Sequence, residues 1–466
     1  MKKSILFLLF AVCNMFAQAQ FVYSPACQQA HCCVLNLDFD SVATINISNN
    51  SSYWIDAYSV YVGQIANNQN VEAQNAIQKV AASIVSLQAT NDNSPELRLA
   101  LADMWLMKSV LFFQKSDYVS AATAYYKSLR YVDATNPLAL KHRLTRTAVE
   151  RLMLNLMPYS SKAANAQLFV QHCQSVATFI ADSSIAQPFK VELCWLFFTV
   201  ISDANVDATS VANVFAIIPT EWFLRCPLLT VSAYKVAVKY GLSNYAQQLM
   251  QCILSNRMDK KIASANMLIG NHLIANASDS CMRYFDACKQ SSHMYVAMKK
   301  AWAHFIQSRT DSADAYVDAV LALQPQTDAD YQAKYECSLR KHWHPQLMKA
   351  RVLFDAAYFE QAKILLDSVD VSALNNIQTA EYNYRMARIL TTIGNVDEAK
   401  QYYQKVVKSG TDAELYYPAY SAYYLGIIYK QEGNKEKSNE WFKLCHKTNS
   451  PIYSESIHRK AKWDME

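Results

Sequence analysis

The sequence predicts an all-α protein, a right-handed α-solenoid in which helix hairpins stack side by side. One pattern of small, apolar and turn residues occurs three times between Leu347 and Asn449, and a shared period of this kind is typical of stacked helical units. The chain has 466 residues but only 7 Gly and 11 Pro, which leaves little material for the turns of a β-rich fold. Its length also exceeds the roughly 250 to 300 residues at which a single hydrophobic core stops growing.

The three copies of the pattern can be aligned residue by residue. The last copy contains Ala422, Leu425, Gly426, Tyr429, Gly433, Ser438, Phe442 and Cys445. The copy before it contains Asn383, Met386, Ala387, Leu390, Gly394, Ala399, Tyr403 and Val406, each 39 positions earlier. A third copy contains Ala350, Leu353, Ala357, Ala362, Leu366 and Val369, another 37 positions earlier.

Each copy is expected to form a hairpin of two helices. Spacings of three and four place one small or apolar stripe on each helix. Gly394 and Gly433 separate the two stripes, because glycine accepts the positive φ that ends a helix. Gly426 lets two backbones approach closely, and Tyr403 and Phe442 fill the space on the next turn. One hairpin cannot bury both stripes, so neighbouring hairpins must stack into a continuous core.

This pattern resembles the tetratricopeptide repeat family, whose signature has Leu-Gly and Tyr on the first helix and Ala and an aromatic residue on the second. Leu425-Gly426 with Tyr429, and Ala399 with Tyr403, carry the resemblance. The large residue that begins the family signature is absent here, and the segment 409–418 adds five residues to the usual repeat of about 34. The resemblance implies a superhelix that binds a protein or peptide in its concave groove.

The first residues have the features of an export signal. Lys2 and Lys3 precede an apolar run over 5–12, and Ala17-Gln18-Ala19 provides a small-x-small cleavage site. We expect cleavage after Ala19. A membrane anchor would need about 20 apolar residues, and the bulky Val12 before Cys13 disfavours lipoprotein processing. The leader and the segment 34–42 resemble exported repeat proteins of Bacteroidota-type bacteria, which implies a periplasmic, cell-surface or secreted protein of a Gram-negative cell.

The chain contains no Ser/Gly-rich linker, which favours one continuous solenoid over separate domains. We expect a signal peptide over 1–19, a cysteine-containing segment with the first helices over 20–52, N-terminal repeats over 53–160, irregular helical repeats over 161–227, central repeats over 228–340, and C-terminal repeats with a capping helix over 341–466. The stretch 327–343 is interpreted as an insertion between repeats, and no mature segment is expected to span a membrane.

Three thiols and one imidazole lie close together near the start of the mature chain. Cys27, His31, Cys32 and Cys33 fall within seven residues. In an export compartment we expect a disulfide from Cys27 to Cys32 or Cys33. A soft-metal site and a thiol-dependent enzyme are the alternatives, but a second pair of metal ligands is missing nearby.

Motifs for catalysis are absent from the sequence. No two glycines are closer than seven residues, which excludes a glycine-rich phosphate loop and the nucleophile elbow of hydrolases. A formal net charge of +5 over 466 residues gives no electrostatic case for nucleic acid. We therefore expect no catalytic residue, no metal and no cofactor, and a protein that is not an enzyme.

The family resemblance implies which residues line the groove, namely those beside the packing stripe of each first helix. The alignment assigns this place to Leu347, Arg351, Phe354, Tyr384, Arg388, Tyr420, Tyr423 and Lys430. Arg351 and Arg388 occupy equivalent positions one repeat apart, so together they could hold a carboxylate. A solvated charged face is the alternative reading of these residues. Glycan binding, with Tyr and Trp stacked on sugar rings, is the alternative function.

Overall fold

The computed structural model describes residues 21–47, 50–67, 73–90, 92–131, 174–202, 207–288 and 292–465. All regular secondary structure in these ranges is helical, which confirms the predicted fold class. The predicted signal peptide, its predicted cleavage site and the stretch 132–173 lie outside the described residues. Within the ranges described, none of the helices is both long and apolar enough to cross a membrane.

The chain divides into two compact units, where the sequence suggested one continuous array. The N-terminal unit comprises 1–236 and 248–264, and the C-terminal unit comprises 237–247 and 265–466. The boundaries fall within helices α13 (Pro227–Lys239), α14 (Ser243–Ser255) and α15 (Ala263–Ala275). Each unit is described by itself below.

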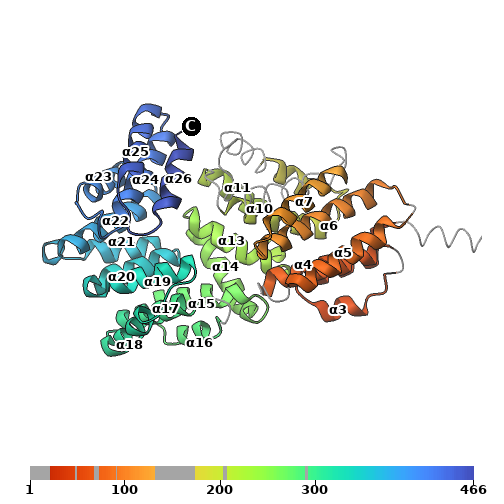
Figure 1. The fold of residues 1–466 in the computed structure, drawn as a ribbon, viewed down its shortest axis with the longest axis horizontal. Coiled ribbons are helices and arrows are strands. Elements are labelled where there is room, and N and C mark those ends of the chain that lie inside the picture. Colours follow the sequence, from red (N-terminus) through yellow and green to blue (C-terminus); the bar gives the residue numbers. More distant parts are fainter. Residues whose placement is uncertain are drawn as a thin grey trace, which may run out of the picture. The chain divides into compact units, whose positions relative to one another are not determined.

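The N-terminal unit consists of helices that pack mainly on their neighbours in the chain (Figure 1). Its first helices are α2 (Pro25–Leu35), α3 (Phe39–Thr44), α4 (Ser51–Asn67), α5 (Ala73–Gln88), α6 (Pro95–Gln114) and α7 (Tyr118–Ser128), followed by the 3-10 turn η1 (Leu129–Tyr131). After the undescribed stretch come α10 (Gln187–Ile201), α11 (Ala208–Ile217), α12 (Thr220–Arg225) and the 3-10 turn η2 (Met258–Lys260). Helix α2 packs on both α4 and α10, so it joins segments that are far apart in the sequence.

The C-terminal unit repeats the hairpin more regularly (Figure 1). Its helices are α15, α16 (Cys281–Asp286), α17 (His293–Ile306), α18 (Thr310–Leu321), α19 (Asp328–Ser338), α20 (Pro345–Asp355), α21 (Phe359–Asp367), α22 (Asn376–Thr392), α23 (Val396–Val407), α24 (Tyr417–Gln431), α25 (Lys435–Lys447) and α26 (Ser454–Asp464), with 3-10 turns η3 (Arg340–His342) and η4 (Val371–Ala373). The pairs α17/α18, α20/α21, α22/α23 and α24/α25 are hairpins, and α26 packs on the last of them.

The hairpins share one turn geometry. The second residue after the first helix has a positive φ in eight of them: Leu37, Ser116, Gly241, Ala277, Ser308, Ala357, Gly394 and Gly433. The next residue donates its N–H to the carbonyl five residues back, as Tyr358 does to Leu353 and Asn395 to Leu390, which is the Schellman ending of a helix. Only three of the eight are glycine, so the others adopt a conformation that costs a residue with a side chain about 1–2 kcal/mol.

The small and aromatic positions of the repeat pack as predicted. Ala399, Tyr403 and Phe442 are completely buried. Gly426 on α24 lies against the ring of Phe442 on α25, and an added Cβ would collide with that ring. Gly270 on α15 has the same relation to an aromatic ring on α16. Close approach at a glycine is therefore used in two separate hairpins.

The stretch interpreted as an insertion is a helix of the fold. Thr327 and Asp330 form a capping box that begins α19. Helix α19 packs on both α17 and α18, and Glu336 and Cys337 on it are buried. The polar start of this segment had suggested an insertion between repeats, but its polar residues form the cap of a helix.

Candidate functional site

Two of the residues assigned to the groove belong to the interior. Leu347 on α20 is completely buried. The guanidinium of Arg351 donates two hydrogen bonds of 2.8 Å to the carboxylate of Glu336 on α19, and it lies 4.2 Å from the ring centre of Trp302. This corrects the prediction for Arg351, because its charge already has a bidentate partner within the fold.

The Glu336–Arg351 pair is buried on both sides, with 5% and 9% of the side chains exposed. Burial disfavours the charge of Glu336, but the charge and the hydrogen bonds of Arg351 outweigh burial and hold the pKa of Glu336 below its usual value. Burial alone would lower the pKa of Arg351, but the charge and the hydrogen bonds of Glu336 outweigh burial and raise this pKa. The pair is therefore ionised and ties α19 to α20.

Two further predicted groove residues hold the last helix. The hydroxyl of Tyr423 donates to Oδ2 of Asp464 at 2.8 Å. The Nζ of Lys430 lies 2.9 Å from the carbonyl oxygen of Asp464 and 3.3 Å from its Oδ1. Both side chains thus connect α24 to α26, the capping helix, which was predicted only as an element.

The four remaining residues come together with one that was not predicted. We define the arginine cluster as Phe354 on α20, Tyr384 and Arg388 on α22, and Tyr420 and Tyr424 on α24. The guanidinium carbon of Arg388 lies 5.0 Å from the ring centre of Phe354 and 4.9 Å from that of Tyr424. It is 6.0 Å from the ring centre of Tyr384, whose hydroxyl accepts a hydrogen bond of 3.4 Å from Nη1. Three successive first helices contribute to this cluster.

Arg388 differs from Arg385 on the same helix and from the buried Arg351 on α20. Arg385 is bound by Glu381 at 2.8 Å and by the hydroxyl of Tyr417 at 3.2 Å, and Arg351 is bound by Glu336. Arg388 is half-buried, and among the described residues no carboxylate forms an ion pair with it. A guanidinium carries five N–H donors, so Arg388 retains donors that can bind a carboxylate in the bidentate geometry.

A tyrosine-rich region adjoins the arginine cluster. The rings of Tyr384 and Tyr417 are stacked with their centres 4.5 Å apart. Tyr416 packs edge-on against Tyr417 at 4.6 Å and against Tyr420 at 5.3 Å. Tyr416, Tyr417 and Tyr424 were not among the residues predicted for the site. All three lie three or four residues from Tyr420, and this spacing was the signal that predicts contact with it along one side of a helix.

The cysteines near the start of the chain are free. Cys27 is buried, Cys32 is exposed and Cys33 is half-buried, and all three lie on α2. Residues five and six apart on a helix point about 140° and about 120° away from each other, so the expected disulfide does not form. Burial raises the pKa of Cys27 to about 12 and also raises the pKa of Cys32 and of Cys33, which disfavours the reactive thiolates.

Comparison with known families gives one match, which falls on this surface. Residues 380–409 match the family model of a tetratricopeptide repeat. The matched segment contains most of α22 and all of α23, including Tyr384 and Arg388. No significant match to a curated protein is found.

Proposed function

We propose that this protein is a non-enzymatic scaffold or adaptor that binds a protein or peptide through the first helices of its C-terminal repeats. A tetratricopeptide repeat suggests protein–protein interaction in general. The observation that carries the specific proposal is Arg388, a half-buried guanidinium among the rings of Phe354, Tyr384 and Tyr424 without a carboxylate partner in the described residues. The partner supplies that carboxylate.

The surroundings of Arg388 support binding of an acidic group over binding of a sugar. Tyr384 and Tyr417 cover each other's ring faces, and only 2% and 3% of these residues are exposed. A sugar ring would need an open aromatic face, which these two stacked rings do not offer. A carboxylate needs only two N–H donors of one guanidinium, and ring contacts hold the guanidinium of Arg388 in place.

Substitution of Arg388 tests the proposal. The mature chain is immobilised, and a partner from cell-envelope extract is identified by mass spectrometry and purified. We expect Arg388→Gln to weaken the affinity for this partner by about 10- to 150-fold, since a hydrogen bond to a charged group contributes about 1.5–3 kcal/mol. Titration calorimetry measures the two dissociation constants.

The matched control is Lys443→Gln, which removes a positive charge from an exposed position on α25. It should leave the affinity unchanged. The binding peptide of the partner is also prepared with its carboxylate replaced by a carboxamide. This change should weaken binding of the peptide to the wild-type protein. It should not weaken binding to Arg388→Gln any further. Equal binding by wild type and Arg388→Gln would refute a role for the cluster, and glycan arrays would then test the alternative.

We propose further that the protein is exported, on the basis of the leader pattern in residues 1–19. Expression in a Gram-negative host should give a mature protein that begins at Gln20 and is released with the periplasmic fraction. Intact-mass spectrometry and N-terminal sequencing measure the cleavage position. A protein that keeps Met1 and stays with the cytoplasmic fraction would contradict this proposal.

A further inference from the structure

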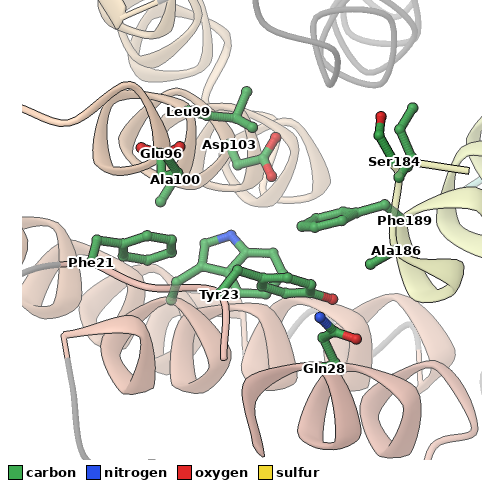
Figure 2. Close-up of a pocket in the computed structure, with 12 residues that line it drawn as sticks. Phe21, Tyr23, Gln28, Glu96, Leu99, Ala100, Asp103, Ser184, Ala186 and Phe189 are labelled. Carbon is green, nitrogen blue, oxygen red and sulfur yellow. The ribbon is translucent and has the colours of Figure 1, made fainter. Parts of the chain in front are cut away.

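The N-terminal unit contains a pocket of about 370 Å³ that is independent of the C-terminal repeats (Figure 2). Its volume lies within the range of about 300–1,000 Å³ that is typical of small-molecule sites. Three parts of the chain form it: the segment 21–28 with α4, one face of α6, and the start of α10 with the residues before it.

One side of the pocket is aromatic. Phe21, Tyr23, Trp54 and Phe189 line it. The rings of Tyr23 and Phe189 have their centres 4.5 Å apart, and the ring of Trp54 lies 6.2 Å from that of Tyr23 and 6.0 Å from that of Phe189. The ring planes of Tyr23 and Phe189 are inclined by 34°. The plane of Trp54 is inclined by 76° to that of Tyr23 and by 46° to that of Phe189. The rings therefore form a wall and not one flat platform.

This wall is held by hydrogen bonds of its own. The Tyr23 hydroxyl is 2.8 Å from Nδ1 of His31, and Nε2 of His31 lies 3.4 Å from the Glu192 carboxylate on α10. The backbone N–H of Phe21 donates to Asp92 at 2.7 Å. The rings are therefore positioned before a ligand arrives, which lowers the entropic cost of binding.

The opposite side of the pocket is acidic. Glu96, Ala100 and Asp103 on α6 lie across the pocket from the aromatic wall (Figure 2). Their spacing of four and three residues places them on one helix face. The other polar lining residues are Gln28 and Ser184, and no Lys, Arg or His is among the described residues that line the pocket. A ligand here meets aromatic side chains and a carboxylate together.

We propose that this pocket binds an organic cation of the alkylammonium class, with its positive charge between the aromatic wall and the carboxylate of Glu96 on α6. Ring faces attract a cation through their quadrupole and also cover its alkyl substituents. Carboxylates only accept hydrogen bonds and carry the opposite charge. A neutral apolar ligand would gain nothing from the acidic side, and an anion would be repelled by it. The ligand is a free alkylammonium compound or the head group of a lipid.

The experiment compares choline with its neutral isostere 3,3-dimethylbutan-1-ol on the full mature chain. Both compounds have the same shape, and only choline is charged. We expect choline to bind at least about tenfold more tightly, in line with the strength of cation–aromatic contacts. Titration calorimetry measures both affinities, and sedimentation with phosphatidylcholine or phosphatidylglycerol vesicles tests a lipid source.

Two variants locate the site. Glu96 is exposed, so Glu96→Gln should fold normally and weaken choline binding by about two- to fivefold. Asp40→Asn removes the same charge from an exposed position on α3 and should change nothing. Ala186→Phe fills the pocket from the start of α10 and should abolish binding.

Selective binding of choline, or of phosphatidylcholine vesicles alone, with loss in Ala186→Phe supports the proposal and identifies the source. Equal binding of the neutral isostere overturns it, because the pocket would then recognise only shape. Absence of binding by choline up to roughly 20 mM and by both vesicles also overturns it. The outcome does not depend on whether Arg388 binds a partner.

Discussion

Replacing Glu336 with alanine is expected to lower the free energy of unfolding of the C-terminal unit by about 3–5 kcal/mol. The substitution leaves the guanidinium of Arg351 buried without its bidentate partner. A buried charge without a partner is costly, whereas the complete pair is close to neutral in stability. Helices α19 and α20 should therefore lose protection together.

A double variant shows whether the stability lost in Glu336→Ala comes from the missing charge partner or from missing packing contacts. Glu336→Leu combined with Arg351→Met replaces the pair by apolar side chains and should recover most of the stability lost in Glu336→Ala. Hydrogen exchange of the α19 and α20 amides is the local measurement, because two compact units need not unfold in one step. If the double variant were as unstable as Glu336→Ala, packing and not charge would explain the loss.

The same pair gives the protein a defined response to acid. The pKa of Glu336 is lower in the folded protein than its usual value, so this group stabilises the fold fully above its unfolded pKa of about 4.3. The contribution is lost as the pH falls through the lower folded pKa. Wild type should lose stability between neutral pH and about pH 3 more steeply than the Leu/Met double variant, as followed by circular dichroism.

Removing the ring of Phe442 is the second change for which we expect a large effect. Phe442 is completely buried and lies against Gly426, so Phe442→Ala should cost about 3–5 kcal/mol. Gly426→Ala should cost about 1–3 kcal/mol through overpacking. This loss is expected even though alanine favours a helix over glycine by about 1 kcal/mol.

The contact can be isolated by combining substitutions. Gly426→Ala with Phe442→Leu should cost less than the sum of the two single changes, because the smaller side chain makes room for the new methyl group. Gly63→Ala on α4 is the control, since an added Cβ there would meet Phe39 at an ordinary 3.5 Å. It should be neutral or stabilising. Denaturant unfolding measures each variant, and strict additivity at 426 and 442 would contradict the proposed contact.

Much of the fold could be predicted because the repeat is local. Spacings of three and four residues bring side chains together on one helix whatever the rest of the chain does. Ala387, Tyr403 and Phe442 are buried as that periodicity predicts. The turn at Ala357 was harder to predict, because a positive φ was sought at glycine and this residue adopts it with a side chain.

The candidate site could be predicted only in part, for the same physical reason. Periodicity identified the helix positions of Arg351, Tyr423 and Lys430, but it could not show which side chains of other helices would meet them. Packing of α19 brings Glu336 to Arg351, and α26 brings Asp464 to the other two. Arg388 receives no such carboxylate among the described residues and keeps donors for a ligand.

The sequence by itself determined the helical class, the hairpin period and the buried stripes, since these follow from contacts between residues a few positions apart. The tertiary structure alone decided which charges are neutralised within the fold and where a cavity forms. The pocket joins Tyr23, Trp54, Asp103 and Phe189 from distant parts of the chain. Such encounters depend on how helices pack, and no spacing along the chain encodes them.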